Sequence, residues 1–206
     1  MRNGAILFVG LFAALGLSWA GIVVGSSQQL GRLAPYYDEA EGAAFPAGFP
    51  GAASGGEAVY RDLNCASCHT QQVRRDGYGN DEARGWGTRQ SVARDYIFQP
   101  AVQLGDARIG PDLANLGQRK VDREGLLRLL YSGRGGMPAY AFLFEKQKIQ
   151  GELSGHALDV SGVAPGWQIV ATPRAEALVS YLLSLSSPYD YPEAKPAAAP
   201  AAEGKK

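Results

Sequence analysis

The sequence has 206 residues, and its 20 lysines and arginines balance its 20 aspartates and glutamates, so the formal net charge at pH 7 is zero. A neutral chain is not expected to bind nucleic acid through attraction to phosphates, although a local basic patch is compatible with this total. The 27 glycines and 12 prolines indicate long irregular connections, and two cysteines are too few for a disulfide framework. The length suits one membrane segment plus one compact domain, or two small domains.

The first predicted element is an apolar helix over residues 5–25, AILFVGLFAALGLSWAGIVVG, which carries no charged side chain. At about 1.5 Å per residue it would span roughly 31 Å, close to the thickness of the hydrocarbon core of a bilayer. We therefore expect residues 1–25 to form a retained transmembrane anchor in contact with lipid, with Trp19 near its outer end. A cleaved signal peptide is the alternative, because Ser18 and Ala20 place small residues at the usual cleavage positions.

The charges that flank this helix favour one orientation. Arg2 and the amino terminus are the only positive charges before it, whereas Asp38, Glu39 and Glu41 follow it. The positive-inside rule then predicts that the N-terminus lies inside the cell and the rest of the chain outside.

The chain after the anchor is expected to be mainly α-helical. Residues 26–53 are rich in Gly, Ala, Pro and Tyr and predict an extended linker, while residues 188–206 predict a disordered Pro/Ala/Lys tail. Between them, residues 54–187 predict a small helical domain with long loops. Its helices are expected over residues 55–64, 95–104 (broken at Pro100), 123–131 and 173–185, the last with Thr172 as its N-cap. Residues 145–172 show no pattern that predicts a role.

Both cysteines lie in LNCASCHTQQ, residues 63–72, as Cys65 and Cys68, and His69 follows directly. This is the attachment pattern for c-type haem. Two thiols three residues apart on a helical turn can each form a thioether with one haem vinyl group, and the next residue can then bind the iron through its imidazole. One such pentapeptide predicts one covalently bound haem c.

Two other uses of these residues are a redox-active dithiol and a zinc site. No alternation of strands and helices like that of thioredoxin surrounds the cysteines, which argues against the dithiol. A zinc site needs four ligands. The candidate ligands are Cys65, Cys68, His69 and His156. Because Cys68 and His69 are adjacent in the sequence, they could bind one zinc ion tetrahedrally only with strain.

The second axial ligand of the iron is Met137 or His156, since Met and His are the usual choices and Met1 precedes the anchor. Met137 lies in the turn GRGGMPAY, where Pro138 fixes the backbone. His156 lies in a polar, Gly-rich segment that is predicted to face solvent. We favour Met137. Ligation by His69 and Met137 would leave no open position at the iron, which favours electron transfer over ligand chemistry.

A second short stretch, Gly110-Pro111-Asp112-Leu113, is the candidate support for His69. A ligating imidazole usually has its other ring N–H held by a backbone carbonyl or a carboxylate. The carbonyl of Pro111 on a rigid turn would serve this purpose. The alternative is a plain turn before a helix.

These features, in this order, resemble class I cytochrome c domains. Such domains combine the haem pentapeptide, a Gly-Pro-Asp/Asn-Leu turn, a Met-Pro pair and a C-terminal helix like EALVSYLLSL. In that fold the first and last helices cross. The resemblance implies a contact made by Gly56, Tyr60 and Tyr181.

The sequence further resembles the membrane-anchored mono-haem subunit II of cbb₃-type haem–copper cytochrome c oxidases. The stretches that carry this resemblance are VYRDLNCASCHTQQVR, ARGWGTRQSVARDYIFQPAVQLGDARIGPDLANLG and MPAYAFLFE. It implies that Cys65 and Cys68 bind haem c and that His69 and Met137 ligate its iron. The chain would sit in a bacterial inner membrane as a single-pass protein, with its haem domain on the periplasmic face.

The resemblance also implies partners. The chain would not reduce oxygen itself but would relay electrons, typically from a dihaem cytochrome c subunit, towards the haem–copper subunit I. The long loop before Gly110 would dock on that subunit through its arginines, which are Arg74, Arg75, Arg84, Arg89 and Arg94. The alternative for this loop is a solvated segment of mixed charge.

Two other functions compete with this one. An independent membrane-tethered cytochrome c could shuttle electrons between complexes, and the linker over residues 26–53 would suit such a tether. The loop from Val73 to Arg108 is longer than a free shuttle needs. A haem-based gas sensor is the third hypothesis, and it requires an open or labile position at the iron.

Overall fold

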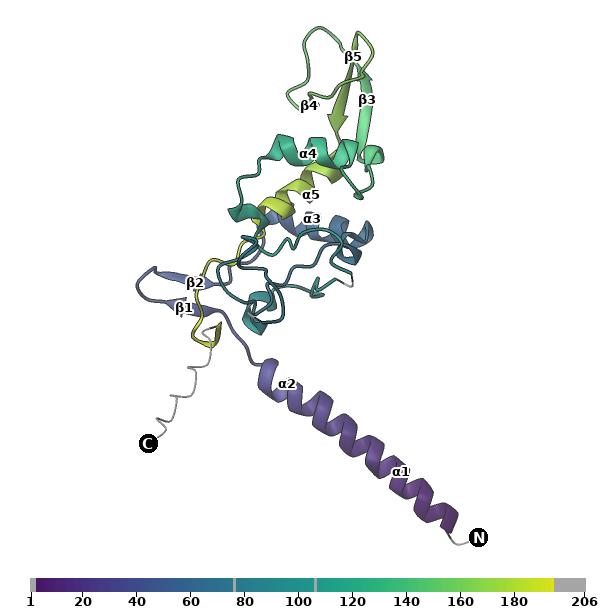
Figure 1. The fold of residues 1–206 in the computed structure, drawn as a ribbon, viewed down its shortest axis with the longest axis vertical. Helices are drawn as coiled ribbons and strands as arrows, with labels where there is room; N and C mark the ends of the chain where they lie inside the picture. The colour runs from purple at the N-terminus through teal and green to yellow at the C-terminus, as the bar shows by residue number, and fades with distance from the viewer. Residues whose placement is uncertain (1–2, 76, 106, 195–206) are drawn as a thin grey trace, which may run out of the picture. The chain divides into compact units, whose positions relative to one another are not determined.

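The computed structural model describes residues 3–75, 77–105 and 107–194 (Figure 1). The chain divides into two compact units, Met1–Phe45 and Pro46–Lys206. It is mainly α-helical with short strands, and it has a long apolar helix near its N-terminus. The predicted fold class is therefore confirmed.

The N-terminal unit begins with a continuous helix from Asn3 to Leu30 that is long and apolar enough to cross a membrane. It consists of α1 (Asn3–Trp19), a wider π-helical turn (Ala20–Val24) and α2 (Gly25–Leu30). The helix continues beyond the predicted end into a polar segment. Here the hydroxyl of Ser26 donates a hydrogen bond of 2.5 Å to the carbonyl of Ile22, one turn back.

The N-terminal unit also contains a hairpin of β1 (Tyr36–Asp38) and β2 (Ala43–Phe45), which pair antiparallel with Tyr36 opposite Phe45. The carboxylate of Asp38 accepts hydrogen bonds from the backbone of Ala40 and Glu41, and Gly42 adopts a φ of 62°. Such Asx and glycine turns close tight connections. Residues 26–53 thus include local structure where the sequence predicts an extended linker. The strands were not predicted because three residues are too few to show an alternation of apolar and polar side chains.

Three helices form the framework of the second unit, and all three were predicted (Figure 1). They are α3 (Gly51–Asp62), α4 (Arg123–Ser132) and α5 (Pro173–Ser184). The start of α5 is as expected: the Thr172 hydroxyl accepts a hydrogen bond of 3.3 Å from the backbone of Ala175, and Pro173 occupies the first turn. Asp122 caps α4 in the same way through the backbone of Gly125, at 2.6 Å.

The helices α3 and α5 are in direct backbone contact at Gly56. A Cβ atom at this position would lie only 1.9 Å from the carbonyl oxygen of Ala177. Beside the contact, the buried rings of Tyr60 and Tyr181 pack with centroids 5.6 Å apart. The contact that the resemblance implied is therefore present, and the absence of a side chain at Gly56 allows it.

The segment between α3 and α4 is a long loop with three short 3₁₀ turns. They are η2 (Cys65–Ser67), η3 (Ala93–Tyr96) and η4 (Leu116–Gln118). The predicted helix over residues 95–104 is wrong, since only its first two residues belong to a helical turn. The loop instead forms hydrogen bonds with Gln71, which follows the cysteine motif. The backbone of Gln71 donates to the carbonyl of Gln103 at 2.8 Å, and the Tyr96 hydroxyl donates to the carbonyl of Gln71 at 2.9 Å.

A three-stranded antiparallel sheet occupies the segment for which the sequence predicts no role. After a short 3₁₀ turn (Ala141–Leu143), it comprises β3 (Phe144–Lys148), β4 (Ala157–Leu158) and β5 (Trp167–Ala171), in the order β3-β5-β4. Within this unit the sheet lies beyond α4, at the opposite end from the long loop (Figure 1). Phe144, Ile169 and Ala171 join the core at its base, whereas Glu145 to Lys148 are exposed.

The chain after α5 packs against the domain through Tyr191 and Ala194, although the sequence predicts a disordered tail from Pro188 onwards. Tyr191 is 1% exposed, and residues Pro192–Ala194 form a final 3₁₀ turn. The buried guanidinium of Arg89 donates a hydrogen bond of 2.6 Å to the carbonyl of Tyr189 and lies over the ring of Tyr191. Residues 195–206 of the predicted tail lie outside the described residues.

The contact at Gly56 predicts a contrast between two adjacent glycines of α3. Gly56→Ala should lower the free energy of unfolding by about 1–3 kcal/mol, because the new methyl group must push α5 away. Gly55→Ala meets no atom within 4 Å and should instead stabilise the helix by about 0.5–1 kcal/mol. Denaturant unfolding of both variants measures the difference, and equal stabilities would contradict the close contact.

Candidate functional site

A cavity of about 550 Å³ lies among α3, α4, α5 and the loops that connect them. Its walls are largely apolar and include Leu63, Leu113, Leu126, Leu130, Leu178 and Leu182. Cofactor sites commonly have roughly this size, from 300 to 1,000 Å³, with a few polar groups at fixed points. The cavity brings together all five predicted site residues, which are Cys65, Cys68, His69, Pro111 and Met137.

The cysteine motif reaches the cavity because the chain turns sharply after α3. Asn64 adopts a left-handed conformation, with φ 55° and ψ 35°, which asparagine tolerates better than most residues. The following 3₁₀ turn is closed by hydrogen bonds from the backbone of Cys68 and His69 to the carbonyl of Cys65, at 3.2 and 3.0 Å. Both thiols and the imidazole therefore line the cavity from a single turn.

Burial changes the acidity of the groups around this turn. It raises the pKa of the Cys65 thiol to about 11, and it also raises the pKa of Tyr140, another residue of the cavity wall. Because the thiolate is the reactive form of cysteine, a thiol with such a pKa is a poor nucleophile at neutral pH. This argues further against a redox-active dithiol in the folded chain.

The imidazole of His69 is held from behind by the loop before α4. Its Nδ1 lies 2.9 Å from the carbonyl oxygen of Pro111. Since a carbonyl only accepts, Nδ1 carries the proton, and the lone pair of Nε2 is left to bind a metal. A Cβ at Gly110 would lie 2.2 Å from Cε1 of the ring, so the glycine leaves the space that the imidazole fills.

Met137 lies in a tight turn after α4. Gly133 ends the helix with a φ of 67°, the backbone of Met137 donates to the carbonyl of Arg134 at 3.0 Å, and that of Tyr140 donates to Leu130 in α4 at 2.7 Å. These bonds fold the turn back towards α4, and Met137 becomes a half-buried part of the cavity wall.

His156, the alternative ligand, lies elsewhere. Its side chain is 67% exposed, and its Nδ1 is 3.7 Å from a carboxylate oxygen of Glu176. It is not among the residues that line the cavity. The geometry therefore supports Met137 as the partner of His69, and it does not assemble the four-ligand zinc set that includes His156.

A family model described as "Cytochrome C oxidase, mono-heme subunit/FixO" matches residues 52–165, more than half of the chain. The chain belongs to the FixO family. No curated protein matches it. The resemblance to subunit II of cbb₃-type oxidases is thereby confirmed.

Membership of the FixO family gives the chain its general role. The chain is a mono-haem subunit of a cytochrome c oxidase, so it takes one haem and works with other oxidase subunits in a membrane complex that carries out electron transport. The match begins in α3 and includes the cysteine motif, the long loop, Met137 and the first two strands of the sheet. It ends just before β5, the central strand.

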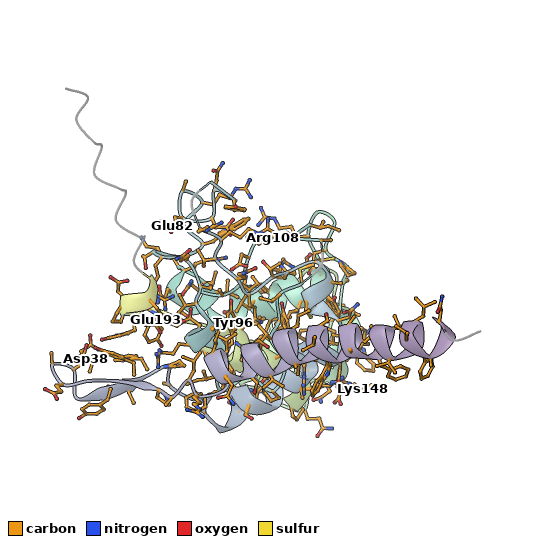
Figure 2. All side chains as sticks on the ribbon, turned by 90° about the horizontal axis from the view of Figure 1, so that it is seen from below. Asp38, Glu82, Tyr96, Arg108, Lys148 and Glu193 are labelled. Carbon is orange, nitrogen blue, oxygen red and sulfur yellow. The ribbon has the colours of Figure 1, made fainter. Side chains whose placement is uncertain are left out.

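The loop arginines have different surroundings in the FixO domain. Arg89 is buried and forms two hydrogen bonds with the carboxylate of Asp95, at 2.9 and 2.7 Å. Arg94 pairs with Glu193, which is labelled in Figure 2, and lies over the ring of Tyr191. These two arginines bind the loop to the end of the chain. Arg74, Arg75 and Arg84 are exposed and remain candidates for a docking surface.

Sequence reasoning missed a set of buried polar groups behind His69. The Tyr60 hydroxyl donates to the carbonyl of His69 at 2.9 Å, and the Tyr181 hydroxyl donates to the side chain of Gln71 at 3.0 Å. Burial raises the pKa of both phenols, so they remain protonated donors. No local pattern signals these bonds, because one of them joins residues 110 positions apart.

The space at Gly110 predicts a second contrast between glycines. Gly110→Ala should displace the His69 ring and reduce haem occupancy roughly tenfold, as the loss of support for a metal ligand commonly does. Gly155→Ala, outside the cavity and with no atom within 4 Å, should leave occupancy unchanged. The haem-to-protein absorbance ratio of the purified chains measures this, and similar ratios in both variants would contradict the predicted displacement.

Proposed function

We propose that this chain carries one covalently bound haem c and acts as a non-catalytic electron relay towards the haem–copper subunit I of a cbb₃-type oxidase. The supporting observation is that one apolar cavity collects Cys65, Cys68, His69 and Met137, with Pro111 behind the imidazole. When bound, the haem supplies an iron centre that gains and loses a single electron.

The two cysteines would attach the haem. Both are free thiols in the cavity wall and come from one turn of the chain, so each could hold one vinyl group of the haem as a thioether. The thioethers would fix the haem on the side of His69.

His69 and Met137 would be the axial ligands of the iron. The Pro111 carbonyl accepts from Nδ1 of His69 and so leaves Nε2 to face the iron, and the turn after α4 places Met137 in the same cavity. Ligation by His and Met raises the reduction potential of a haem and leaves no open coordination position. This favours electron transfer over gas sensing.

The walls of the cavity would control how water and partners reach the haem. The leucines of α4 and α5 exclude water from its interior. Ile109, Pro111 and Pro138, which also line the cavity, are exposed, and Ile109 is 76% exposed. The cavity therefore reaches the surface beside these residues, where a redox partner could approach.

The N-terminal helix would be retained as a single-pass anchor in the bacterial inner membrane, with the haem domain on the periplasmic face. The positive charges support this orientation, since Arg2 and the amino terminus precede the helix and Arg32 is the nearest basic residue after it. The immediate partners would be subunit I and a dihaem cytochrome c subunit. The exposed arginines of the loop, Arg74, Arg75 and Arg84, are the part of the predicted docking surface that remains open to a partner.

The composition of the native complex tests this function. We expect the chain, solubilised in mild detergent, to purify in a fixed ratio with a copper-containing large subunit. On a denaturing gel its band should stain for haem, and its intact mass should include one haem and an uncleaved N-terminus. A stained chain that purifies alone would support the independent shuttle, and an unstained chain of apoprotein mass would overturn the covalent haem.

The ligand assignment predicts different outcomes at Met137 and His156. Met137→Ala should leave the covalent haem in place, lower the reduction potential, and allow the ferrous protein to bind carbon monoxide, because one iron position becomes open. His156→Ala should change none of these, since its side chain lies in solvent. Redox titration and carbon monoxide difference spectra measure both variants. Carbon monoxide binding by the unaltered chain to the same extent would contradict the assignment.

A further inference from the structure

The turn Gly110–Leu113, which supports His69, forms backbone hydrogen bonds with the residues directly before and after His69. The backbone of Gly110 donates to the carbonyl of Cys68 at 2.9 Å, and the backbone of Leu113 donates to the carbonyl of Thr70 at 2.8 Å. Between these two bonds lie Pro111, which accepts from His69, and Asp112. The position of the Pro111 carbonyl is therefore set by how firmly this turn is held.

The carboxylate of Asp112 is the main side-chain anchor of this turn. It is fully buried, with 0% of the residue exposed. Its Oδ2 accepts from the hydroxyl of Thr70 and from the backbone of Gln72 at 2.8 Å, and its Oδ1 accepts from the backbone of Ala114 at 2.9 Å. Two of these three donors belong to the residues that follow His69. The carboxylate thus joins the Pro111 turn to the haem-binding segment.

Burying a carboxylate costs free energy unless its charge is paired, and here a nearby cation offsets part of that cost. Arg108, labelled in Figure 2, lies 3.9 Å from Oδ2 of Asp112 and 2.7 Å from Oδ2 of Asp81, and its guanidinium lies over the ring of Trp86. Its φ of 47° is unusual for a residue with a side chain. Arg119 adds a hydrogen bond to the backbone carbonyl of Asp112. These contacts hold Asp112 in place from the side away from His69.

We propose that Asp112 is a positioning residue for His69, and that by holding the Pro111 carbonyl against Nδ1 it lowers the reduction potential of the bound haem. This inference rests on the proposed function, because it requires His69 to ligate the iron.

Two effects of Asp112 act in the same direction. A firm hydrogen bond from Nδ1 to the carbonyl raises the basicity of Nε2, which stabilises the more positive, oxidised iron. A buried negative charge nearby also favours the oxidised state. Removing the carboxylate should weaken both effects, so the potential should rise.

The test is Asp112→Asn in the full-length chain with its haem attached. Redox titration should show a higher potential, with the ratio of reduced to oxidised protein at a fixed potential increasing roughly tenfold, which is about 59 mV for one electron. Nuclear magnetic resonance should show a shift of the His69 ring N–H. An unchanged potential in a variant that carries its haem would overturn the proposal.

Asp81→Asn is the matched control. Asp81 is also buried and pairs with Arg108, but its side chain accepts from the backbone of Arg74 instead of from the Pro111 turn and its neighbours. We expect a smaller change in potential and an unchanged His69 N–H resonance. If this variant matches Asp112→Asn in both measurements, Asp112 acts through its charge alone, and the positioning role is wrong.

A second variant covers the case in which Asp112→Asn does not fold. Thr70→Val removes one donor to the carboxylate and keeps the charge and the side-chain volume. It should raise the potential less than Asp112→Asn and still shift the His69 resonance, and no change in either would overturn the proposal. Failure of the unaltered chain to carry covalent haem would contradict the proposed function itself, and it is detected first by the haem stain.

Discussion

The backbone contact between α3 and α5 at Gly56 is the constraint on which the arrangement around the cavity depends. Because the two helices touch without an intervening side chain, Tyr60 and Tyr181 come together on one side of the contact. The chain leaves α3 directly into the turn that carries both cysteines and His69, while α5 contributes Leu178 and Leu182 to the opposite wall of the cavity. A single crossing therefore sets both the position of the cysteine turn and the apolar wall of the cavity.

The long loop is stabilised differently from the helices. It contributes few side chains to the apolar core, and its buried charges are paired instead: Arg89 with Asp95, and Arg108 with Asp81 and Asp112. Breaking such a pair leaves an uncompensated buried charge, which typically costs about 3–5 kcal/mol. These pairs hold the loop in one conformation where apolar packing alone would not. The Pro111 carbonyl depends on that conformation, and so does the orientation of the imidazole.

The features that could be predicted from the sequence are those whose cause is local. The cysteine motif, the N-cap of α5 at Thr172, the apolar N-terminal helix and the cavity position of Met137 all follow from neighbouring residues or from elimination among few candidates. The buried position of Tyr191 could not be predicted, because the arginine that holds it lies about 100 positions earlier. The sheet of residues 144–171 was missed because its strands are short and its central strand comes last in sequence. The buried role of Asp112 also depends on donors some 40 positions away.

The pairing of the loop with the end of the chain has a consequence for how this protein is handled. Since Arg89 and Arg94 bind the residues from Tyr189 to Glu193, the described chain reaches Ala194 beside the loop and not at the end of α5. An affinity tag or fluorescent fusion that replaced the residues after Ala194 would start next to the turn that Arg94 binds through Glu193. A fusion there would lie beside the loop, whereas a fusion inserted in the exposed segment between β3 and β4 would emerge at the opposite end of the domain.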